Sequence, residues 1–115
     1  MNDKFEPLFK KIKELTNYAM LIADRTINAI NADNPDKVVI VGYLNHANSI
    51  ISTAKAIYIS NSEILERNDI DSLFAQFDIF VMEVLSDLED NHTYEYSNIE
   101  YDRLKEKFNC CVLSQ

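Results

Sequence analysis

Residues 35–60 read PDKVVIVGYLNHANSIISTAKAIYIS, and this stretch decides the fold. Its β-branched run at 38–41, followed by Gly42, is typical of a strand, and of the first strand of a dinucleotide fold in particular. Gly42 is the only glycine, however, so the fingerprint G-x-G-x-x-G is absent. The apolar residues also recur every three or four positions, which is the spacing of one helix face. We therefore favour a helix from 35 to about 60, with an end at 67 as the alternative. Its face comprises Ile40, Leu44, Ala47, Ile51, Ala54 and Tyr58.

The segment before this stretch has the same periodicity, so a helix is expected over about residues 4–32. The turn between the two segments reads NADNPD at 31–36. In it, Asn34 is predicted as the N-cap of the second helix and Pro35 as its first residue. A connection this short makes the two helices antiparallel neighbours. The apolar spacing of the first helix alternates between three and four along Phe5, Leu8, Ile12, Leu15, Ala19, Ile22, Thr26 and Ala29.

Both helices carry a second apolar stripe beside the first. One neighbouring helix cannot bury two stripes, so we expect the later helices to cover part of this surface and a second copy of the chain to cover the rest. A homo-oligomer is therefore predicted. Its candidate interface residues are Met20, Ala23, Ile27, Val39, Tyr43 and Ile50.

Two further helices are expected after residue 67. The first runs from a cap at Asn68 or Asp69 to about Asp90, and a polar loop, HTYEYSN, follows at 92–98. Ser97 and Glu100 have the spacing of a capping box that would open a short last helix. We expect the tail from Asn109 onward to fray.

The chain is thus predicted to form one all-α, bundle-like domain over residues 1–115. A long hairpin at 4–67 precedes acidic helices at 68–115. The 115 residues include one glycine and two prolines. Because these residues punctuate turns, their scarcity indicates few turns and long elements, and it argues against a β-sandwich, a barrel or a small solenoid.

Charge divides the chain into two unequal halves. Residues 1–61 carry seven basic and six acidic residues, whereas residues 62–115 carry four basic and thirteen acidic residues, a net charge of −9. The second half should therefore repel nucleic acid and attract a basic protein partner. Tyr94 and Tyr96 lie in this acidic half. Tyrosine is a frequent interface anchor, although both rings could equally pack on the core. The candidate partner-binding residues are Glu83, Asp87, Asp90, Tyr94 and Tyr96.

No constellation of residues points to catalysis, a cofactor or a metal. Glu83, Asp87 and either Asp90 or Asn91 share a helix face, and His92 is nearby in what reads as a loop. The Glu-x-x-His pattern of a di-metal bundle is missing, however, and a solvated acidic face is the simpler interpretation. His46 stands in a polar strip of small residues without an aligned nucleophile. The lysines at 10, 11 and 13 could contact phosphates, but glutamates dilute them, so DNA binding stays uncertain.

Cysteine use and targeting signals indicate an intracellular protein. The only cysteines are the neighbours Cys110 and Cys111, which rarely reach disulfide geometry and are expected to be reduced thiols. The N-terminus lacks an apolar signal core, and no apolar run approaches the length of a membrane span. A cytoplasmic protein without a membrane contact is expected.

The stretch YAMLIADRTINAINADNPDKVVIVGYLNHANSIISTAKAIYISN, residues 18–61, resembles the oligomerisation core of small terminase subunits of tailed phages. The resemblance covers about residues 8–65. It implies a ring-forming, non-enzymatic DNA-packaging subunit that assists a larger motor-nuclease subunit. No N-terminal helix-turn-helix precedes the hairpin, so the DNA-binding part of that role is in doubt. The matching positions are Asp33, Asn34, Pro35, Lys37, Val38, Val39, Leu44 and Asn48.

Three functional hypotheses follow. The first is a non-enzymatic assembly or adaptor protein that oligomerises and contacts a larger partner. The second is an acidic inhibitor or regulator whose carboxylates imitate phosphates and occupy a basic surface of another protein. The third, an enzyme, is the weakest, because no nucleophile, base and orienting group coincide.

Overall fold

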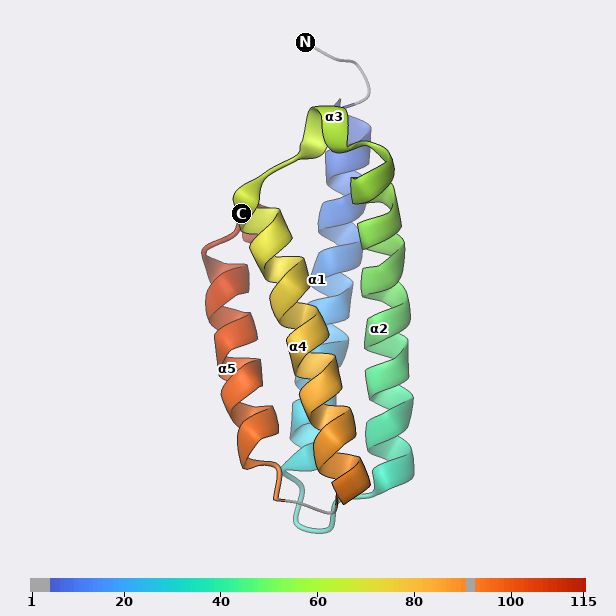
Figure 1. The fold of residues 1–115 in the computed structure, drawn as a ribbon. Helices are drawn as coiled ribbons and strands as arrows, with labels where there is room; N and C mark the ends of the chain where they lie inside the picture. Colours follow the sequence, from blue (N-terminus) through green and yellow to red (C-terminus); the bar gives the residue numbers. More distant parts are fainter. Residues whose placement is uncertain (1–4, 91–92) are drawn as a thin grey trace.

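Four long helices run alternately up and down along the molecule (Figure 1). The computed structural model describes residues 5–90 and 93–115, and within these ranges the chain is all-α and contains no strand. The molecule measures 51 × 21 × 21 Å, and its long axis runs along the helices (Figure 1). The elements are α1 (Phe5–Ile30), α2 (Lys37–Ser60), α3 (Ser62–Leu65), α4 (Asn68–Asp90), α5 (Glu95–Asn109) and a 3₁₀ turn, η1 (Val112–Ser114).

The helix predicted from the deciding stretch is confirmed, but its boundaries differ from those expected. Residues 38–44 lie wholly inside α2, which excludes the strand alternative. The N-cap is Asp36 and not Asn34, and Pro35 lies outside the helix. The Asp36 carboxylate accepts a hydrogen bond from the Val38 N–H at 2.9 Å. Asp36 therefore supplies the capping interaction that the sequence had suggested for Asn34.

The second helix ends at Ser60, and a separate single turn, α3, follows before α4 begins. Tyr58 stabilises this change of direction. Its hydroxyl lies 2.8 Å from Asp71 Oδ1 and accepts a hydrogen bond from the Arg67 N–H at 2.9 Å. Burial and the neighbouring Asp71 raise the pKa of Tyr58. One side chain of α2 thus fixes the start of α4.

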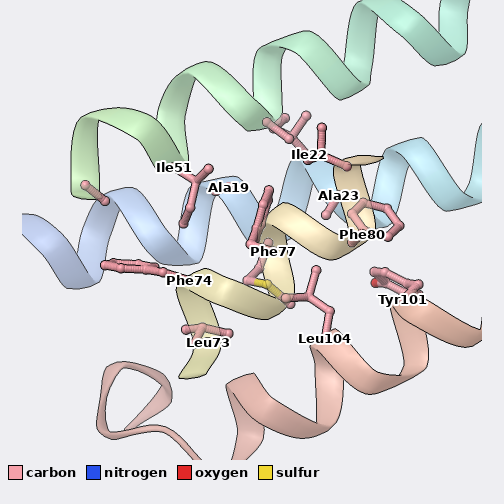
Figure 2. Packing of buried hydrophobic residues seen from close by; sticks show 14 of the residues in the cluster. Ala19, Ile22, Ala23, Ile51, Leu73, Phe74, Phe77, Phe80, Tyr101 and Leu104 are labelled. Atoms are coloured by element: carbon pink, nitrogen blue, oxygen red, sulfur yellow. The ribbon is translucent and has the colours of Figure 1, made fainter. Parts of the chain in front are cut away.

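All four long helices contribute to a single hydrophobic core. Figure 2 shows the rings of Phe77 and Phe80 directed toward the stretch of α1 that carries Ala19 and Ala23. The small side chains of α1 leave room for the large rings of α4, as close packing of a core requires. On the other side of α4, Leu104 of α5 is also fully buried.

The C-terminal residues are not frayed, contrary to expectation. Cys111 and Leu113 are fully buried. The Asp69 carboxylate accepts a hydrogen bond from the Val112 N–H at 2.8 Å, and Asn17 of α1 donates to the Leu113 carbonyl at 3.0 Å. The tail therefore closes the end of the bundle, between the start of α4 and the side of α1.

Candidate functional site

The acidic residues predicted on α4 do not form one solvated face, because Asp87 is buried. Only 2% of Asp87 is exposed, and its Oδ2 accepts hydrogen bonds from the Ser97 hydroxyl at 2.7 Å and the Ser97 N–H at 3.2 Å. Ser97 is the third residue of α5, so Asp87 satisfies a free N–H of the first turn and places negative charge at the positive end of that helix. The acidic-face interpretation is wrong for Asp87, which caps α5 from another helix.

The predicted capping box at Ser97 and Glu100 is also wrong, because the side chain that binds the Ser97 N–H is Asp87 of another helix. The helix begins two residues earlier, at Glu95, and Ser97 is fully buried within its first turn. Glu100 instead accepts a hydrogen bond from Gln76 at 3.0 Å and pairs with Arg103 at 3.2 Å. Ser97 thus binds Asp87 of α4, and Glu100 binds Gln76 of α4 and Arg103 of α5.

The other candidate partner-binding residues differ in exposure. Asp90 and Tyr96 are exposed, whereas Glu83 and Tyr94 are partly buried. Burial and the charge of Asp87 raise the pKa of Tyr94. The exposed pair lies at the end of the bundle where α4 passes to α5 (Figure 1).

Within residues 5–90 and 93–115, no three His, Cys, Asp or Glu side chains converge as a metal site would require. Asn91, the alternative to Asp90 on this acidic face, and His92 lie outside the described ranges. His46 is exposed on α2, and its ring packs edge-on against Tyr18 of α1, with centroids 5.6 Å apart. His46 therefore contributes to the surface between the two helices.

The lysines near the start of α1 differ in exposure and in contacts. Lys10 and Lys11 are exposed, while the Lys13 ammonium donates to the carbonyl oxygen of Gln115. One of the three lysines is thus engaged in holding the C-terminal turn.

The candidate oligomer residues fall into two groups. Met20, Ala23 and Ile27 are buried inside the single chain, so the second stripe of α1 is covered by the chain's own helices and not by a second copy. For these three the interface prediction is wrong. Val39 is exposed, and Tyr43 and Ile50 are partly buried.

The exposed part of this prediction belongs to a larger apolar surface on the first hairpin. The contact between Tyr18 and His46 fixes the register of α1 against α2. Because the helices are antiparallel, Leu21, one turn after Tyr18, lies level with Tyr43, one turn before His46. Tyr18, Leu21 and Val39 are all exposed. We call Tyr18, Leu21, Val39 and Tyr43 the hairpin face.

A second exposed apolar surface lies on α4 and was missed by sequence reasoning. Ile79, Met82 and Leu85 are exposed at 46%, 70% and 43% of their areas. They follow one another at intervals of three residues, beside the buried apolar stripe of α4. The spacing of these apolar residues is therefore visible in the sequence. Only the packed structure shows which side of α4 the other helices cover. We call these three residues the α4 ridge.

The two cysteines are free and lie in different environments. Cys110 is exposed, whereas Cys111 is buried, and burial together with the nearby Asp69 raises the pKa of the Cys111 thiol. Cys111 therefore acts as a core residue of the C-terminal turn.

None of the helices in the described part of the chain combines the length and apolar character needed to cross a bilayer. No protein-family model, curated protein or solved structure matches the chain.

Proposed function

We propose that this protein is a non-enzymatic helical adaptor that associates with itself through the hairpin face and contacts a partner protein through its second half. The observation that carries the proposal is the hairpin face, where large apolar side chains remain exposed on both helices of one hairpin. Contiguous exposed apolar surface on a small protein is typical of a protein-binding site.

Charge favours a second copy as the occupant of the hairpin face. Residues 1–61, which include both helices of this hairpin, are close to neutral, whereas residues 62–115 have a net charge of −9. A two-fold contact brings identical surfaces together, so it is opposed by repulsion wherever a surface carries net charge. The hairpin face is the surface on which that cost is small.

The resemblance to small terminase subunits agrees with this proposal, because their oligomerisation core is also a long hairpin. It further suggests an adaptor for a larger motor subunit, without direct DNA recognition. An electrophoretic shift with duplex DNA at low salt tests this point. We expect no shift for this chain, and a shift that disappears when Lys10 and Lys11 are replaced by glutamine would contradict the adaptor version.

Light scattering coupled to size exclusion tests self-association. We expect the wild-type chain to form a defined oligomer at tens of micromolar, with little dependence on salt. The double substitution Leu21→Ser and Val39→Ser should reduce the mass to that of one chain. Ile99→Ser, which alters an exposed apolar residue on α5, is the matched control and should leave the mass unchanged. A wild-type chain that elutes as a monomer would contradict the proposal.

The second candidate function is an acidic regulator that occupies a basic surface of another protein. The composition of α4 favours it, because that helix contains seven acidic residues, at 69, 71, 78, 83, 87, 89 and 90, and no lysine or arginine. Asp87 is buried and Asp69 binds the C-terminal turn, so the other five supply the acidic surface. Partner binding should then weaken steeply as salt rises, since exposed charges are screened. An adaptor assembled through the hairpin face should keep its mass in the same salt series.

A further inference from the structure

The α4 ridge crosses the outer surface of α4 between two helices that are already in place. Lys55 of α2 pairs with Asp78 on one side of α4, and Glu100 of α5 binds Gln76 on the other. Between these contacts the outer surface of α4 faces away from α1, which lies behind it in Figure 1. The ridge therefore lies on the exposed side of α4, away from the core of the bundle.

The spacing of the ridge suits a helical occupant. Side chains three residues apart form an inclined row on a helix surface, and such rows pack into the grooves of a neighbouring helix laid nearly alongside. Ile79, Met82 and Leu85 form one such row of two intervals. A helix packed against them would extend the bundle by one member with the same kind of contact that α4 already makes.

The charge around the ridge selects the partner. Asp78, which pairs with Lys55, and Glu83 neighbour the ridge along the chain. Glu89 is exposed one turn after Leu85, and α4 itself contains no lysine or arginine. Two copies joined through this surface would bring the carboxylates of both α4 helices together, which is unfavourable. A partner with basic residues beside its apolar face would instead place opposite charges across the rim of the contact.

We propose that the α4 ridge docks an amphipathic helix of a partner protein, with apolar side chains along one face and lysines or arginines on both flanks. The inference rests on the proposed adaptor function and names the partner surface for it. It uses residues different from those of the hairpin face, so the two contacts can be broken separately.

The test uses the full chain and a synthetic probe. The probe is a fluorescent helical peptide of about 18 residues, or five turns, with leucines along one face and lysines on both flanks. A peptide of the same composition with the leucines scattered around the helix measures attraction to acidic surface alone. A third peptide carries glutamate in place of lysine. Anisotropy titrations should give binding of the first peptide and much weaker binding of the other two.

Substitutions then locate the contact. Met82→Ser should weaken binding of the first peptide by about tenfold, or about 1.4 kcal/mol, because it removes the most exposed apolar side chain of the ridge from the contact. Ile99→Ser, at an exposed apolar position on α5 outside both the ridge and the hairpin face, is the matched control and should bind like the wild type. Circular dichroism checks that both exposed-site variants stay folded.

The outcomes distinguish this inference from the adaptor proposal. Equal binding by Met82→Ser and the wild type, equal binding of the scattered peptide, or a loss caused by Ile99→Ser would each overturn docking at the α4 ridge. A wild-type monomer that still loses peptide binding on Met82→Ser would overturn self-association and support the ridge.

Discussion

The first hairpin, α1 with α2, and the second, α4 with α5, are built by different means. The first packs through regular rows of aliphatic residues and alanines, and its two helices are joined by a short turn. The side-chain hydrogen bonds that link separate elements converge on α4, α5 and the C-terminal turn. Examples are Asp87 with Ser97, Gln76 with Glu100, and Asp69 with Val112. Apolar rows thus hold α1 against α2, whereas α4, α5 and the C-terminal turn are also held by polar contacts between separate elements.

This difference explains why acidic composition misled the interpretation of the second half. A carboxylate on a helix is usually solvated, but two of the acidic residues of α4 instead bind the backbone at the start of another element. Asp87 caps α5, and Asp69 caps η1. Part of the negative charge of this half is therefore structural, and the surface charge that a partner meets is smaller than the composition suggests.

Replacement of Asp87 by alanine should have the largest effect. The change leaves the hydroxyl and N–H of Ser97 buried without an acceptor, and hydrogen bonds to charged groups contribute about 1.5–3 kcal/mol each. We expect Asp87→Ala to lower the free energy of unfolding by about 2–3 kcal/mol in urea titrations. Asp90→Ala, on an exposed position of the same helix, is the control and should change it by less than about 0.5 kcal/mol. Equal effects would show that Asp87 does not hold α5.

Asp69 gives a smaller effect with a defined pH dependence. Burial opposes its ionisation, but hydrogen bonds from Arg67 and the Val112 N–H outweigh burial and lower the pKa of its carboxyl. A carboxyl whose pKa is lower in the folded state stabilises the fold above its unfolded pKa, and this contribution disappears as the pH falls through the folded value.

We therefore expect Asp69→Asn to cost about 1–2 kcal/mol at pH 7. The gap between variant and wild type should narrow below about pH 4, near the unfolded pKa of an aspartate. Thermal melts at pH 7 and pH 3 measure both values. Asp33→Asn, in the exposed turn after α1, is the control. A gap that stays constant across this range would mean that the charge of Asp69 is not what holds the C-terminal turn.

The sequence allowed the helices, their order and most of the apolar core to be predicted, because these depend on local periodicity. Ile40, Leu44 and Ile51 illustrate this, since all three are fully buried as their spacing requires. The pattern could not show which surfaces the chain covers by itself. Met20 and Ile27 were predicted to need a second copy, yet both are buried by their own chain.

Contacts between residues distant in sequence lay outside what periodicity can indicate. Ser97 and Glu100 have the spacing of a capping box, but the acceptor for Ser97 comes from Asp87 on another helix. Likewise, nothing local marks Asp69 as the partner of Val112. The exposed α4 ridge was missed because an apolar row beside the buried stripe can be assigned to the core or to the surface only when the neighbours of that helix are known.

The last and smallest effect concerns Gly42, in the first hairpin, and it should be stabilising. Gly42 lies inside α2 and is exposed, and a Cβ added there would meet no atom within 4 Å. Glycine in a helix interior costs about 0.5–1 kcal/mol relative to alanine, because it loses more backbone freedom on folding. We expect Gly42→Ala to raise the free energy of unfolding by about that amount.

Gly42→Val then tests whether this segment is helical or extended, because alanine is more favourable than valine in a helix and less favourable in a strand. In a helix, valine loses side-chain freedom and should gain less than alanine, whereas in a strand valine should be the better of the two. Urea titrations of the three proteins, at a concentration that keeps their oligomeric state the same, give the order. Valine more stabilising than alanine would place residues 38–44 in an extended conformation, and the first hairpin would then not be built from apolar helix faces.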